Sequence, residues 1–361
     1  MGPRVAFFGS SLVSSYWNGA ATYYRGLIKA LSRRGWHVTF FEPDVLERQR
    51  YRDIEDPPWA EVVVYSAEDE GPVNRALHAA RAYDIIVKAS GVGVFDRLLE
   101  RAVRELKGAG RLTVYWDVDA PATLARVDAD PNDPFRDDIP EYDLVVTYGG
   151  GPAVVEAYRR LGSCATVPVY NGADLETHHP VPREPRFDVD AALLANRLPD
   201  REARIEEFFF RPARAMADRA FLLGGNGWDQ QHLPGNVRAV GHVPTVDHNA
   251  FNCGPTALVS VNRSSMADTG YSPATRIFEA AAAGGCLITD AWAGIEEFFV
   301  PGVEILVAHS GADVADLLRG LSKAQAQKIG QAALSRVRHE HTYEHRAAVV
   351  ERVMGVSRGA V

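Results

Sequence analysis

The sequence predicts an α/β protein with two open domains, each built on a parallel β-sheet covered by helices on both faces. Short apolar runs alternate with amphipathic segments over almost all of the 361 residues, a proline-rich pause lies at 177–186, and the alternation then resumes. Alternating strands and helices favour a parallel sheet, because two parallel strands need a crossover connection. At about 150 residues per domain, the length also predicts two domains.

The first half contains apolar runs, rich in β-branched and aromatic residues, that we expect to be buried strands. These strands are Val5–Phe8, Val38–Phe41, Ile85–Val87, Leu112–Trp116, Leu144–Thr147 and, before Asn171-Gly172, Val167–Tyr170. Helical periodicity between them predicts helices over Ala20–Arg33, Val73–Arg81, Phe95–Leu106 and Pro152–Leu161.

The second half repeats the pattern after a predicted linker near residues 176–190. The expected strands are Ala191–Ala195, Ala220–Leu223, Val237–Val240, Ala257–Val261 and Cys286–Thr289, with helices over Arg201–Ala217 and Pro273–Ala283 and a helical tail over Ala312–Met354. The predicted domains are 1–175 and 176–340, and a final helix at about 340–361 is expected to pack back on the first domain. The facing sheets would place a ligand in the cleft between the domains, outside the carboxyl ends of the strands.

Composition excludes several classes of protein. Asp and Glu number 47 against 39 Lys and Arg, a net charge of −8, which argues against nucleic acid as the main partner. Three scattered cysteines fit no disulfide framework and suit a reducing compartment. The N-terminus lacks a signal-peptide pattern, and no run approaches the roughly 18 apolar residues of a membrane helix. We therefore expect a cytoplasmic protein without a transmembrane segment, as a monomer or homodimer.

Small residues follow the first predicted strand. Gly9 and Ser10 end it, and Asn18 and Gly19 precede the next helix, where backbone N–H groups could receive an anion. The pattern is neither the dinucleotide motif G-x-G-x-x-G nor a P-loop, and a plain tight turn is the alternative interpretation.

Asp117 is the candidate catalytic residue. It closes the strand Leu112–Trp116 and stands two positions before Asp119, at an expected ligand-binding edge. A carboxylate there could act as a general base or accept hydrogen bonds from a polyol, and the alternative is an acidic residue that caps the turn before Pro121.

Strand ends of the second half carry the candidate ligand-binding residues. Arg197 and Arg201 suit a diphosphate because the guanidinium group can bind phosphate with two hydrogen bonds; ion pairs with Glu202 or Glu206 are the alternative. Glycines permit close approach of a ligand, and Trp228 is either a stacking surface for a base or a packing residue. The remaining candidates at these ends are Asn196, Gly225, Asn226, Gly227, Gly241 and His242.

The segment Gly270–Asp290 is the most informative. Ser272 is expected as N-cap and Pro273 as the first helical residue, so that N–H groups near Thr275 and Arg276 would stabilise a diphosphate. Glu279 follows on an apolar helix, where a buried carboxylate needs partners and a ribose diol supplies two donors. An exposed helix carboxylate is the alternative.

No metal site is predicted. His341 and His345 lie four residues apart on a predicted helical segment, but no H-E-x-x-H motif or carboxylate at ligand spacing accompanies them.

Five segments of the second half resemble the CgeB-like, spore-maturation-type glycosyltransferases. They are Tyr271-Ser-Pro-Ala-Thr-Arg-Ile-Phe-Glu-Ala, Thr289-Asp290, Gly294-Ile-Glu-Glu-Phe-Phe, Pro301-Gly-Val-Glu304 and Arg338-His-Glu-His-Thr-Tyr343. The resemblance covers residues 190–350 and, more loosely, 1–175. It implies the GT-B fold of two Rossmann-like domains, with a nucleotide-sugar on the C-terminal domain and an acceptor on the N-terminal one. It also implies that Glu279 binds the donor ribose, that Ser272–Arg276 hold the diphosphate, and that no metal is required.

One departure concerns Tyr271. Many retaining GT-B enzymes carry two glutamates eight positions apart, and Tyr271 occupies the place of the first, which leaves the stereochemical course open. The leading hypothesis is a metal-independent glycosyltransferase, of hexosyltransferase type, without a tightly bound cofactor. Its donor would be a UDP-sugar, with GDP- or ADP-sugar as alternatives, and its acceptor a glycan, small molecule or protein. Two hypotheses compete with it: a sugar-nucleotide epimerase or hydrolase, and a non-catalytic nucleotide- or glycan-binding protein.

Overall fold

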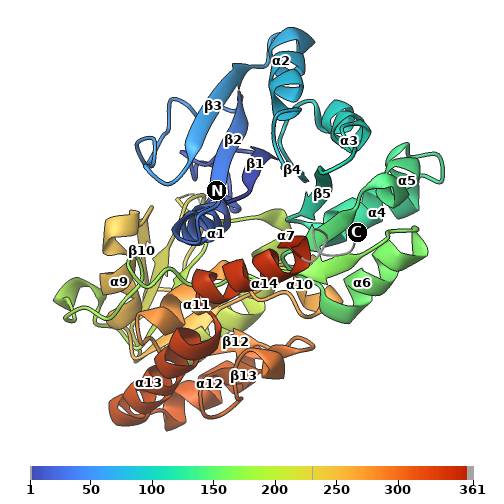
Figure 1. Ribbon diagram of the computed structural model, residues 1–361. Coiled ribbons are helices and arrows are strands. Elements are labelled where there is room, and N and C mark those ends of the chain that lie inside the picture. The colour runs from blue at the N-terminus through green and yellow to red at the C-terminus, as the bar shows by residue number, and fades with distance from the viewer. Residues whose placement is uncertain (1, 230, 356–361) are drawn as a thin grey trace. The chain divides into compact units, whose positions relative to one another are not determined.

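The computed structural model describes residues 2–229 and 231–355 and divides the chain into two units. The first unit runs to Asn171 and resumes at Tyr343, and the second spans Gly172–Thr342. Residues 176–190, expected as a linker, lie within the second unit, and each unit contains one all-parallel sheet with its helices (Figure 1).

The first unit has a seven-stranded sheet of order β3-β2-β1-β4-β5-β6-β7. Its strands are β1 (Arg4–Phe8), β2 (His37–Asp44), β3 (Glu61–Ser66), β4 (Ile85–Ala89), β5 (Leu112–Asp117), β6 (Leu144–Thr147) and β7 (Thr166–Pro168). Its helices are α1 (Ala21–Arg33), α2 (Glu70–Ala80), α3 (Asp96–Glu105), α4 (Ala120–Ala129), α5 (Phe135–Asp138), η1 (Ile139–Glu141), α6 (Gly151–Arg160) and α14 (Tyr343–Gly355).

Alternating side chains of β1 divide the core of this unit between the two faces of the sheet. Val5 and Phe7 pack with residues of α1 and α14, whereas Ala6 and Phe8 pack with residues of α2 and α3. This is the arrangement of a parallel strand buried on both sides, and it explains why these strands read as continuous apolar runs.

The second unit has a six-stranded sheet of order β10-β9-β8-β11-β12-β13. Its strands are β8 (Ala191–Leu194), β9 (Phe221–Gly224), β10 (Val237–Gly241), β11 (Ala257–Ser260), β12 (Leu287–Asp290) and β13 (Leu306–Ala308). Its helices are η2 (Pro185–Phe187), α7 (Pro199–Ile205), η3 (Glu206–Phe210), α8 (Arg211–Ala215), α9 (Thr245–Cys253), α10 (Ser264–Thr269), α11 (Thr275–Ala282), η4 (Ile295–Glu297), α12 (Gly311–Gly320) and α13 (Lys323–Glu340).

The structure contains elements that the sequence did not predict. They are the edge strand β3, the short β13 and the helices α4, α5, α9 and α10. The helix expected over Arg201–Ala217 is present as α7 and α8, joined by the π-helical turn η3. That turn buries Phe208, Phe209 and Phe210 in succession.

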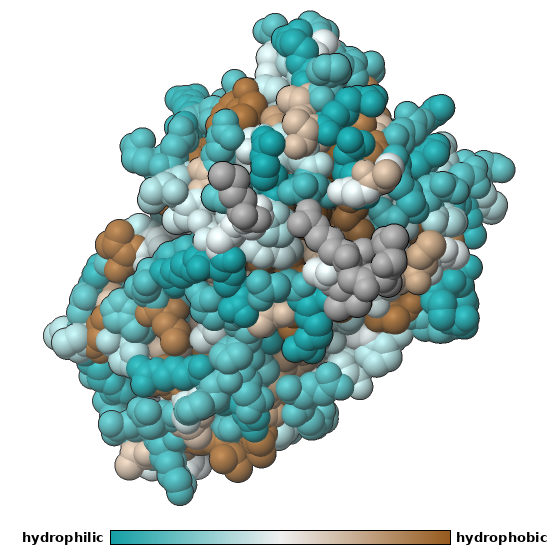
Figure 2. Space-filling view, in the orientation of Figure 1, coloured by the Kyte–Doolittle hydropathy of each residue, from teal (hydrophilic) through white to brown (hydrophobic). Residues whose placement is uncertain are grey.

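The surface is largely hydrophilic on the face drawn in Figure 2, with apolar residues in small separate groups. Within the described ranges, no helix combines the length and the apolar character that crossing a bilayer requires.

Candidate nucleotide-sugar site

Three loops meet at the carboxyl ends of β8, β9 and β10. Asn226 N–H donates to Asn196 Oδ1 at 2.9 Å, and Asn226 O accepts from Arg197 N–H at 2.9 Å. Gly225 N–H donates to Gly241 O at 2.7 Å. The structure thus brings together five of the residues predicted from strand ends.

Gly225 and Trp228 have packing reasons for their identity. A Cβ at Gly225, where φ is +119°, would lie 2.1 Å from Ala195 O, so only glycine fits. Trp228 is buried, its Nε1–H donates to Ala195 O at 2.8 Å, and its ring meets Phe210 edge-on. The packing interpretation of Trp228 therefore describes this structure.

The other glycine and histidine candidates at these ends are more open. Gly227 has φ of +88° and lies against the Cβ of Arg197, whereas Gly241 has φ of +66° with free space around it. His242 is exposed beside it.

The arginine side chains at this edge contact carboxylates. Arg197 Nε lies 2.8 Å from Glu202 Oε1, which is the ion pair that the sequence left open as an alternative. Sequence reasoning did not single out Arg204, which binds the buried Asp290, whose carboxylate also accepts from Asn262 N–H. Arg201 is partly buried in the first turn of α7.

The start of α11 corrects one prediction. The helix begins at Thr275 with Ala274 as N-cap, so neither Ser272 nor Pro273 has its expected position. Residues 271–274 instead form an irregular turn, in which Ser272 Oγ donates to Gly270 O at 2.9 Å. No side chain caps this helix end.

Tyr271 is held in a left-handed backbone conformation, with φ of +47°. Its N–H donates to Ala293 O at 2.6 Å, and a Cβ at Gly294 would lie 2.3 Å from its ring. Tyr271 is thus fixed by close packing on the loop after β12.

Glu279 is buried, with 6% of its surface exposed, as the apolar character of its helix predicted. Its Oε2 lies 3.6 Å from Arg276 Nη1 and its Oε1 lies 3.9 Å from His178 Nε2. Burial would raise the pKa of this carboxyl, but the neighbouring His178, Arg276 and His248 outweigh burial and hold the pKa below its usual value.

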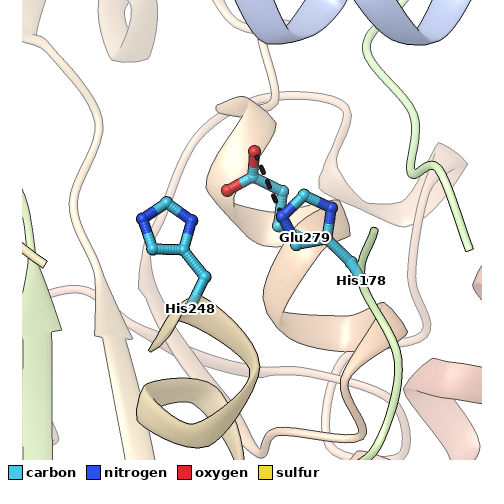
Figure 3. A group of neighbouring side chains, drawn as sticks. All are labelled: His178, His248 and Glu279. Carbon is cyan, nitrogen blue, oxygen red and sulfur yellow. Dashed lines mark ion pairs between the residues drawn. The ribbon is translucent and has the colours of Figure 1, made fainter. Parts of the chain in front are cut away.

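His178 and His248 belong to this group and were not predicted. Figure 3 shows the two imidazoles on separate segments beside the helix that carries Glu279. His178 follows β7 in a segment without periodicity, and only the fold brings it to α11, so no local signal in the sequence indicates it.

These three side chains are also the one group of possible metal ligands found among the described residues. One ligand atom from each lies within 4.8 Å of the others. Ligands of a tetrahedral zinc ion lie closer, at roughly 3.3 Å from one another. The permanently charged Arg276, at 3.6 Å from the carboxylate, also opposes a divalent cation.

In the first unit, Ser10 and Asn18 stabilise a single loop. Ser10 Oγ donates to Asn18 Oδ1 at 2.9 Å, and Asn18 Nδ2 donates to Ser11 O and Ser14 O at 2.8 and 3.0 Å. Gly9 is required by packing, because a Cβ would lie 2.4 Å from the ring of Phe40, whereas Gly19 has open space.

Asp117 is fully buried, and both of its oxygens accept hydrogen bonds. Oδ1 accepts from Asp119 N–H and Thr123 Oγ1, both at 3.0 Å, and Oδ2 accepts from Tyr158 OH at 2.5 Å. Burial raises the pKa of Asp117 despite these donors. The geometry matches the turn-capping alternative at the start of α4.

Residues 201–352 match the model of a family described as glycosyl transferase-like, whose description does not name the CgeB-like group. No curated protein sequence is significantly similar to the chain.

Solved structures resemble the whole chain at low sequence identity. Sucrose-phosphate synthase from Thermosynechococcus elongatus has a TM-score of 0.72 and 17% identity over 99% of this chain and 100% of its own. HepE from Anabaena, in complex with UDP-glucose, has a TM-score of 0.67 and 14% identity over 98% and 100%. The T4 phage β-glucosyltransferase BGT, in complex with its UDP-glucose substrate, has a TM-score of 0.61 and 13% identity over 97% and 98%.

The two parallel sheets with their helices, and the likeness to these structures over nearly the full length, confirm the predicted fold class. The chain has the GT-B fold, and its residues 201–352 match the glycosyl transferase-like family.

Proposed function

We propose that this protein is a glycosyltransferase that moves a sugar, of hexose type, from a nucleotide-sugar to an acceptor without a catalytic metal ion. A UDP-sugar is the favoured donor, because HepE and T4 BGT were solved with UDP-glucose. The observation that carries the proposal is the buried Glu279 on α11 of a GT-B fold. Its carboxylate would accept hydrogen bonds from the two hydroxyls of the donor ribose.

The diphosphate would lie at the start of α11, close to Thr275 and Arg276, with Arg197 and Arg201 as cationic partners. As the glycosidic bond to the diphosphate breaks, negative charge develops on the leaving group, and positioned donors stabilise it. The Arg197 guanidinium contacts the Glu202 carboxylate at 2.8 Å. When the donor binds, a phosphate oxygen would take the place of that carboxylate. The acceptor would bind to the first unit, where Asp117 would keep the start of α4 in place.

Isothermal titration calorimetry with UDP, GDP and ADP tests the donor site. We expect one of the three to bind, and Glu279→Gln to weaken that binding about tenfold or more, because a buried carboxylate bonded to hydroxyls is lost. Glu297→Gln, at an exposed position of η4, is the matched control and should leave binding unchanged. If none of the three nucleotides binds, the proposal is wrong.

Turnover distinguishes the transferase from its rivals. Incubation of the protein with UDP-glucose in EDTA should release UDP slowly and faster with a suitable acceptor. An epimerase would convert the sugar without an acceptor, and a non-catalytic binding protein would bind UDP without turnover of any donor in a panel.

A further inference from the structure

His178 is a buried histidine whose ring nitrogens have no hydrogen-bond partner among the described residues. Only 3% of its surface is exposed. Leaving a buried polar group unpaired costs about 1–3 kcal/mol. A water molecule or a bound ligand can supply the missing partner of such a group.

The position of His178 is fixed by hydrogen bonds to α9. Asn249 Nδ2 donates to Thr177 O at 2.9 Å, and Asn249 Oδ1 accepts from His179 N–H at 3.2 Å. Asn249 thus binds the backbone on both sides of His178. These two hydrogen bonds fix the backbone that places the His178 ring beside α11.

The ring of His178 faces the carboxylate of Glu279 without bonding to it. The separation of 3.9 Å between Nε2 and Oε1, marked in Figure 3, is too long for a hydrogen bond. One oxygen atom at ordinary hydrogen-bond distance, roughly 2.8 Å, from both atoms fits this spacing. The two side chains can therefore hold the same small oxygen group.

The chemistry of the group matches a sugar hydroxyl. Burial lowers the pKa of His178, so the ring is neutral at pH 7 and can donate one N–H bond. The Glu279 carboxylate can only accept. A hydroxyl donates its proton to the carboxylate and accepts from the imidazole, so one hydroxyl pairs both side chains at once.

We infer that His178 is a second ribose ligand, which binds a hydroxyl also held by Glu279 and makes the site select ribonucleotides over their deoxy analogues. This inference rests on the proposed function, because it takes the ligand of Glu279 to be the donor ribose. It adds a second partner to a hydroxyl that Glu279 already holds, and so a stronger preference for that hydroxyl than Glu279 alone supplies. A site that hydrogen-bonds a hydroxyl strongly rejects an analogue that lacks it, since its buried polar groups then stay unpaired.

The test compares UDP with 2′-deoxy-UDP and 3′-deoxy-UDP by calorimetry; if the first titrations show GDP or ADP to be the ligand, the corresponding analogues are used. Wild type should prefer the ribonucleotide over at least one analogue by about tenfold or more. His178→Phe removes the donor and keeps a ring, and should reduce that preference by about threefold or more, while Glu279 still accepts from the hydroxyl. His178→Gln keeps an N–H donor and should restore part of it.

His341→Phe is the matched control, because His341 is another buried histidine of the same unit, and this substitution should leave the preference unchanged. Circular dichroism identifies variants that fail to fold; if His178→Phe is one of them, His178→Asn takes its place. A preference that is unchanged in folded His178→Phe overturns the inference and leaves the proposed function intact. A wild type that binds no nucleotide overturns the proposed function itself.

Zinc is titrated alone as a final arm. Stoichiometric Zn²⁺ binding that His178→Phe abolishes, together with an unchanged ribose preference, would overturn the inference in favour of a metal site. Absence of such binding is the expected result.

Discussion

At the scale of single residues, the carboxylates of the two units have different surroundings. Asp117 is surrounded by donors from its own chain, whereas Glu279 faces His178 and Arg276 at distances of 3.6–3.9 Å, longer than hydrogen bonds. A carboxylate whose hydrogen bonds are complete has little capacity left for a ligand. One whose neighbours stand slightly apart has room for a hydroxyl, so Glu279 is the better ligand-binding candidate.

Asp117→Ala should destabilise the first unit by about 3 kcal/mol, because the substitution leaves the buried donors of Thr123, Tyr158 and the Asp119 amide unpaired. Urea denaturation at pH 7 measures this. The exposed Asp128→Ala on the same helix α4 serves as control and should change stability by less than about 0.5 kcal/mol. A folded, fully stable Asp117→Ala would show that these hydrogen bonds do not hold the turn.

Residue patterns predicted the site unevenly. The burial of Glu279 followed from Phe278 and the alanines around it, because an apolar helix indicates its own burial. His178 was beyond prediction, because its position depends on Asn249, seventy residues away in the chain. The N-cap at Ser272 was wrong because a serine followed by proline signals a helix start that here forms an irregular turn.

At the scale of elements, prediction succeeded where strands were buried on both faces. β6 matches its predicted range, and β1 and β5 differ from theirs by one residue. β3 was missed although it contains the apolar run Val62–Tyr65, and as an edge strand its residues from Glu61 to Ser66 are mostly exposed or half-buried. β13 is three residues long, too short for a period to show.

The helices α1 and α14 pack closely against each other. A Cβ at Gly26 would lie 2.1 Å from the ring of Tyr343, and Arg33 Nη1 lies 3.2 Å from Glu344 Oε1. α14 therefore packs on α1 through a glycine that leaves space for a tyrosine. A side chain at this position would have to separate the two helices.

Gly26→Ala should destabilise the first unit by about 1–3 kcal/mol, although alanine favours helix by about 1 kcal/mol, because overpacking a core outweighs propensity. Thermal unfolding followed by circular dichroism measures the change. Gly320→Ala, at the end of α12 with open space around it, lacks the clash and should not lower stability. Equal stability of both variants would contradict the packing described.

At the scale of the whole molecule, the sign of its pH dependence can be worked out from the two histidines beside Glu279. Burial lowers the pKa of His178, and burial followed by the charge of Arg276 lowers that of His248 to about 4. In the unfolded chain both would titrate near pH 6.5. Between about pH 6.5 and 4 the unfolded chain therefore binds more protons than the folded one, and stability falls as the pH falls.

The double variant His178→Gln, His248→Gln removes these two groups and should flatten the dependence of the unfolding midpoint on pH in this window. The two histidines contribute on the order of 2 kcal/mol or more to the free energy of unfolding of wild type above pH 6.5. This contribution is lost progressively as the pH falls toward 4. Thermal scans at half-unit steps from pH 4 to 8 measure it, with His78→Gln, exposed on α2, as control.

Carboxylates such as Asp53 and Asp96, whose pKa values are lowered below 3.8, lose their contribution at lower pH and should leave an acid transition common to all three proteins. Parallel curves for wild type and the double variant between pH 6.5 and 4 would mean that folding does not lower the pKa values of the two histidines, which would then become protonated within this window. The neutral imidazole required for ribose binding would then be absent at the lower end of this range, and the preference for ribonucleotides should weaken there as well.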